Sequence, residues 1–154
     1  MKKILIFGCG AMGGAILSGC LAKGLWKKEE IYVKEHSEEH PRKASRYGVH
    51  ASMDGREAKE ADLVILAVKP NVVPGVLQEI SRYHPSRVLS IAAAVTLASL
   101  EGALPEETEV IRVMPNTPAS VGKAWLPLHR ERKHPPISSG KRKRFSPPWG
   151  RKRW

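Results

Sequence analysis

The chain has 154 residues, 42% of them hydrophobic, which is enough for one globular domain with a buried core. No apolar run reaches the roughly 18 residues that a membrane span needs, and Cys9 and Cys20 lie outside any CxxC or Cys/His cluster. The sequence therefore suggests no membrane-spanning helix, disulfide framework or zinc site, and a cytoplasmic protein is expected. The formal net charge is +11, of which +10 falls on residues 123–154.

Short β-branched runs alternate with helical patterns between residues 4 and 114. Strands are predicted at 4–7, 31–33, 49–51, 63–68, 87–91 and 109–114. Helices are predicted at 11–23, 37–47, 72–83 and 97–104, with a helical turn at 56–61. The continuous apolar run at 63–68 is typical of a strand buried on both faces. This alternation predicts an α/β fold of the Rossmann type, a doubly wound and mostly parallel sheet with helices on both faces.

The pattern changes after Gly122. Residues 123–154 hold five of the twelve prolines and eleven of the 26 Lys and Arg residues, and they show no sustained period. Such a composition predicts low order. The chain is therefore divided into an NAD(P)-binding Rossmann domain at 1–122 and an irregular, basic, proline-rich tail at 123–154.

A G-x-G-x-x-G motif directly follows the first strand and opens the first helix. Its first glycine suits the tight turn, its second allows a pyrophosphate to approach the backbone, and its third allows close packing of helix on strand. The N-terminus of the helix then offers N–H groups and a partial positive charge to the phosphates. The motif predicts cofactor binding by Gly8, Cys9, Gly10, Ala11, Met12 and Gly13.

The residues after the second strand are expected to contact the adenosine ribose. An acid about 20 residues beyond the motif binds the 2′-hydroxyl of NAD, whereas a basic residue binds the 2′-phosphate of NADP. Glu35 is placed for the first role. Lys34, His36, Ser37 and Arg42 are alternatives for the second, and solvated loop charges are a third interpretation.

Two further segments end strands on the rim where open α/β sheets bind their ligands. The segment at 113–118 holds Asn116 and Thr117 between two prolines, and both side chains can hydrogen-bond a carboxamide or a carboxylate. A plain Asn-Thr turn is the structural alternative. The segment at 67–70 is predicted to contact the cofactor through Ala67, Val68, Lys69 and Pro70, although Lys69 also fits a solvated charge at the end of a strand.

Four stretches together resemble the pyrroline-5-carboxylate reductases: residues 6–16, 61–70, 89–96 and 111–119. The resemblance runs from residue 1 to Gly122, and the segment Met114-Pro-Asn-Thr-Pro118 is its most specific part. It implies hydride transfer from NADPH, or from NADH, to the C=N carbon of 1-pyrroline-5-carboxylate, which gives L-proline in proline biosynthesis. It also implies that Asn116 and Thr117 lie near the nicotinamide and the substrate, and that NADPH is preferred.

The chain departs from the family at Ala94, where glycine is usual, and again after Gly122. The family continues into a helical domain that builds the dimer and much of the substrate pocket, and residues 123–154 do not resemble that domain. The resemblance thus implies a homo-oligomer for the family, but the domain that builds the dimer is missing from this sequence. Three functions remain: a reductase impaired by this loss, a cofactor-binding remnant without catalysis, and nucleic-acid binding through the basic tail. The last is disfavoured against a solvated, nonspecific cationic segment.

Overall fold

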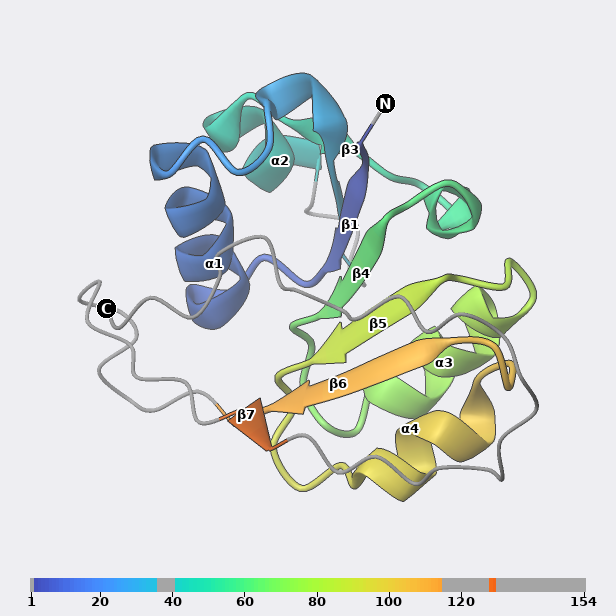
Figure 1. The fold of residues 1–154 in the computed structure, drawn as a ribbon. Coiled ribbons are helices and arrows are strands. Elements are labelled where there is room, and N and C mark those ends of the chain that lie inside the picture. Colours follow the sequence, from blue (N-terminus) through green and yellow to red (C-terminus); the bar gives the residue numbers. More distant parts are fainter. Residues whose placement is uncertain (1, 36–40, 115–127, 130–154) are drawn as a thin grey trace.

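A computed structural model, which describes residues 2–35, 41–114 and 128–129, places all its strands in one sheet (Figure 1). The strands are β1 (Ile4–Phe7), β2 (Ile31–Lys34), β3 (His50–Ala51), β4 (Leu63–Leu66), β5 (Arg87–Ser90), β6 (Glu109–Val113) and β7 (Leu128–His129). Their order across the sheet is β3-β2-β1-β4-β5-β6-β7. Neighbouring strands pair in parallel, except that β7 is antiparallel to β6.

Helices cover both faces of this sheet. They are α1 (Ala11–Ala22), α2 (Pro41–Tyr47), α3 (Val73–Ser81) and α4 (Leu97–Ala103), with 3-10 turns η1 (Lys28–Glu30) and η2 (Arg56–Lys59). Figure 1 shows α1 and α2 on one side of the sheet and α3 and α4 on the other. The strand order and the two helical layers are those of a doubly wound Rossmann fold, so the predicted fold class is confirmed.

The strands at the centre of the sheet divide the core into two layers. All four side chains of β1 and of β4 are buried, which confirms the prediction made from the apolar run that starts at Leu63. Because successive strand residues face opposite sides, Ile4 and Ile6 pack with α1 and α2, whereas Leu5 and Phe7 pack with α3 and α4. Burial on both faces fixes β1, and with it the position of the loop that follows.

Several boundaries differ from the predicted ones. Strand β4 ends at Leu66 instead of residue 68, because the chain turns there toward the loop after β1 and reaches Pro70, which cannot extend a ladder. Turn η1 was not predicted from the sequence; its first N–H groups are satisfied locally, with Lys27 N–H donating to Glu30 Oε2 at 2.8 Å. The two-residue strand β7 was not predicted either, since so short a segment carries no period. The predicted Ser37 N-cap and the predicted boundary at Gly122 lie outside the described residues.

Ala94, in the connection between β5 and α4, adopts φ +59°. This left-handed conformation is costly for an L-residue with a Cβ and natural for glycine. Glycine would adopt this conformation without that cost.

Among the described helices, none is long and apolar enough to cross a membrane.

Candidate cofactor-binding site

The loop after β1 is packed against the end of β4. Gly8 adopts φ +90°, and a Cβ placed on it would lie 2.6 Å from the carbonyl oxygen of Ala67. A Cβ on Gly13 would lie 2.0 Å from the carbonyl oxygen of Gly8. Both contacts are shorter than van der Waals distance to backbone atoms that cannot easily move. These two glycines are therefore required by the fold itself, because they bring β1, α1 and β4 together.

Gly10 differs from the other two glycines of the motif. It is the exposed N-cap residue of α1, with φ −72° and ψ −159°, and a Cβ on it would meet no protein atom within 4 Å. Within the described chain no side chain caps this helix, and its first turn holds no acid. Uncapped N–H groups and the helix dipole attract an anion, and the open space at Gly10 would admit one. The site thus fits the pyrophosphate of a dinucleotide.

Glu35 follows β2 and turns its carboxylate to the same loop. Its Oε1 accepts a hydrogen bond of 2.6 Å from the backbone N–H of Cys9 and lies 3.7 Å from the ammonium of Lys43 on α2. Burial of the Cys9 thiol, reinforced by the negative charge of Glu35, raises its pKa. The thiol is therefore protonated at neutral pH, which agrees with its interpretation as a small filler residue.

The structure thus brings together three of the predicted segments. The glycine loop contacts Ala67 and Val68, and Glu35 is tied to it through Cys9, while Lys69 and Pro70 are exposed on the same rim. His36, Asn116 and Thr117 lie outside the described residues, so their roles stay predictions.

Two basic residues near the segment predicted to contact the ribose have partners that were not predicted. Lys34 forms an ion pair with Glu79 of α3, on the face opposite to the glycine loop. Lys43, which pairs with Glu35, was not singled out in the sequence. The signal available in the sequence was the basic pair Arg42-Lys43, which lies at the start of α2, the next helix after Glu35.

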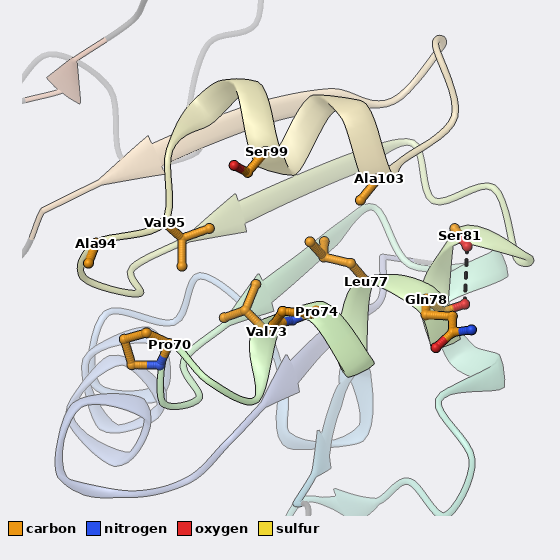
Figure 2. A pocket seen from close by; sticks show the side chains of 10 residues that line it. All are labelled: Pro70, Val73, Pro74, Leu77, Gln78, Ser81, Ala94, Val95, Ser99 and Ala103. Carbon is orange, nitrogen blue, oxygen red and sulfur yellow. Dashed lines mark hydrogen bonds between the residues drawn. The ribbon is translucent and has the colours of Figure 1, made fainter.

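An apolar groove of about 530 Å³ separates α3 from α4 (Figure 2). One end of the groove, at Pro70 and Ala94, opens at the rim of the sheet, and the other lies by Ser81, whose hydroxyl donates to the carbonyl oxygen of Gln78 at 3.1 Å. None of the lining side chains is ionisable, so the groove brings no acid or base to the rim.

Among the described residues, no three His, Cys, Asp or Glu side chains cluster as a metal site requires.

Residues 3–94 match the family model described as NADP oxidoreductase, coenzyme F420-dependent. Over 127 residues the chain is 43% identical to the pyrroline-5-carboxylate reductase of Escherichia coli (strain K12), and the aligned part covers 78% of this chain and 46% of that protein. It is 38% identical over 139 residues to the pyrroline-5-carboxylate reductase of Corynebacterium melassecola, with 86% and 51% covered. The chain spans about half the length of the curated relatives it matches.

Solved structures of pyrroline-5-carboxylate reductases also match this chain. A pyrroline-5-carboxylate reductase from Coxiella burnetii matches with a TM-score of 0.74 at 32% identity, over 81% of this chain and 48% of that one. The pyrroline carboxylate reductase of Plasmodium falciparum, solved with NADP bound, matches with a TM-score of 0.69 at 28% identity, over 81% and 46%. The chain therefore belongs to the NADP oxidoreductase, coenzyme F420-dependent family, and within it resembles the N-terminal half of the pyrroline-5-carboxylate reductases.

Proposed function

We propose that residues 1–122 are the cofactor-binding domain of a reductase that converts 1-pyrroline-5-carboxylate to L-proline. The observation that carries this proposal is the glycine loop, where Gly10 opens onto space at an uncapped helix N-terminus, in a chain whose relatives are named for this reaction. The bound nicotinamide cofactor, NADPH or NADH, supplies the hydride for the C=N carbon.

The residues of the chain would hold and orient this cofactor. The N–H groups at the start of α1, from Ala11 to Gly13, bind the pyrophosphate, and Gly10 leaves room for it. The rim segment from Ala67 to Pro70, of which Ala67 and Val68 lie beside the loop, would contact the cofactor as well. By the resemblance, Asn116 and Thr117 bind the carboxamide or the substrate carboxylate. The reaction centres must be held about 3–3.5 Å apart for transfer, so these contacts would set the rate.

The test is a pair of measurements on the purified full chain. Binding of NADPH and NADH is followed by nicotinamide fluorescence, and turnover by the loss of absorbance at 340 nm after addition of 1-pyrroline-5-carboxylate. Saturable binding with turnover that depends on the substrate is the expected result. Failure to bind either cofactor would contradict the proposal at its first step.

A second candidate function is a cofactor-binding domain without turnover. The chain matches only about half of each reductase, and loss of the residues that position a substrate costs most of the rate of hydride transfer. Saturable cofactor binding with no oxidation of either cofactor would identify this second function and reject the first for the chain alone.

A further inference from the structure

An ion pair lies where the carboxyl ends of β1 and β2 meet α3. The ammonium of Lys34, the last residue of β2, contacts Oε1 of Glu79 on α3. Both side chains are largely buried, with 15% of Lys34 and 21% of Glu79 exposed. The same ammonium lies 5.8 Å from the centre of the ring of Phe7, the last residue of β1. One side chain thus links the ends of two neighbouring strands to a helix.

The backbone of Lys34 is bonded to the first glycine of the loop. The N–H of Gly8 donates a hydrogen bond of 2.8 Å to the carbonyl oxygen of Lys34. Because Gly8 directly follows Phe7, the side chain and the carbonyl of Lys34 both hold the point at which the chain leaves β1. The path from there to Gly10 and the start of α1 is only two residues long.

We infer that Lys34 and Glu79 are a positioning pair, which fixes the entry to the glycine loop and so keeps the N-terminus of α1 in the geometry that binds a pyrophosphate. The inference rests on the proposed function. Neither side chain touches the loop's open space, since the pair lies on the face of the sheet that packs against α3. Its effect on binding therefore passes through the strand ends.

Stability alone is a poor reason for two charges at this place. Taking charges out of water costs free energy that their attraction only partly returns, and apolar side chains of similar size often stabilise a fold as well or better. The surroundings of the pair do restrict its position. A Cβ on Gly55 would lie 2.5 Å from Glu79 Oε1 and 3.1 Å from Phe7 Cζ, so the turn at Gly55 closes over both groups. The carboxylate is thus confined between a turn, an aromatic ring and an ammonium.

The test measures loop geometry and cofactor affinity in Glu79→Gln, which keeps the shape of the side chain and removes its charge. Amide hydrogen exchange, followed by NMR on the full chain without cofactor, reports how firmly the Gly8 N–H is held. We expect this amide to exchange about tenfold faster or more. The N–H of Ile91, which donates to the carbonyl of Leu66 at 3.1 Å at the same end of β5, should change little. Affinities for NADPH and NADH, from nicotinamide fluorescence, should both fall about three- to tenfold.

Three variants separate position from stability and from charge. Ile80→Val shortens the neighbouring buried side chain of α3, so it destabilises the same helix and should leave cofactor affinity unchanged. Glu101→Gln removes a charge from an exposed site on α4 and should alter neither readout. The double variant Lys34→Met with Glu79→Gln leaves no unpaired charge at the site. It should show the same fast exchange at Gly8 and the same loss of affinity as Glu79→Gln.

The inference and the proposed function fail in different ways. Unchanged exchange at Gly8 in Glu79→Gln, or a rise that Ile91 shares equally, would overturn the inference, and so would unchanged cofactor affinity beside fast exchange. If the unaltered chain bound neither cofactor, the proposed function would fail on its own. Fast exchange confined to Gly8 would then still support a positioning pair, and equal exchange at the two amides would overturn it.

Discussion

At the scale of single residues, the glycines of one motif are required for different reasons. Gly8 and Gly13 leave no space for a Cβ because backbone oxygens of the protein lie where it would be. Gly10 has that space, and its backbone angles are open to any residue. A requirement for glycine at position 10 can therefore come only from something that binds there.

Alanine substitutions distinguish these reasons. Gly10→Ala should leave the free energy of unfolding within about 0.5 kcal/mol of the original and weaken cofactor binding by about tenfold or more, because the methyl group occupies the pyrophosphate position. Gly13→Ala should destabilise the fold by about 2 kcal/mol or more, since its Cβ would lie 2.0 Å from a carbonyl oxygen. Urea unfolding and fluorescence titration measure the two effects.

Gly19 provides the matched control within the same helix. A Cβ there meets no atom within 4 Å, so Gly19→Ala should keep full cofactor affinity and gain up to about 1 kcal/mol from helix propensity. Equal affinity in Gly10→Ala and Gly19→Ala would show that no ligand approaches the backbone at position 10.

At the scale of elements, the connection between β5 and α4 carries backbone strain at Ala94. Its φ of +59° costs roughly 1–2 kcal/mol for alanine, against roughly 0.5–1 kcal/mol of extra chain entropy that glycine loses on folding. Ala94→Gly should therefore stabilise the protein by about 0.5–1 kcal/mol in urea unfolding.

The neighbouring alanine tests whether this gain depends on the conformation. Ala93 is also exposed but has no positive φ, so Ala93→Gly should cost about 0.5–1 kcal/mol. Destabilisation of similar size by both substitutions would mean that the strain at Ala94 is relieved in solution.

Which elements could be predicted from sequence follows from how local their causes are. The strand runs and the glycine spacing are set by residues close in the chain, so the sheet, the loop at Gly8 and the approach of Glu35 could all be anticipated. Strand alternation would also have shown that Lys34 and Glu35 face opposite sides. The ion pair of Lys43 with Glu35 and the pairing of β7 with β6 depend on how separate segments pack together. The periodicity of hydrophobic residues within one segment does not predict such contacts.

At the scale of the whole molecule, charge is unevenly distributed. Residues 123–154 carry +10 of the total of +11, which leaves the cofactor domain nearly neutral. Cofactor binding and any binding of nucleic acid by this basic segment should therefore respond differently to salt. Raising salt from about 50 to 200 mM should weaken binding to duplex DNA by about a thousandfold if six phosphates are contacted.

Cofactor affinity should change by less than about threefold over the same range, because on the proposed function the cofactor would be held mainly by short hydrogen bonds from the loop. Fluorescence titrations of labelled DNA and of NADH on one preparation give both dependences. Binding to DNA that persists at high salt would favour a specific nucleic-acid function over a solvated cationic segment.

The central place of β1 has a consequence for synthesis of the chain. This strand is synthesised before β2 and β4, the two strands with which it pairs on its two edges. At about 5–20 residues per second, Leu63 follows Ile4 by about 3–12 s. During that interval an apolar strand has unpaired edges, a state in which nascent chains associate or recruit chaperones. Lys2 and Lys3 set two charges beside it, and charged flanks of this kind slow such association.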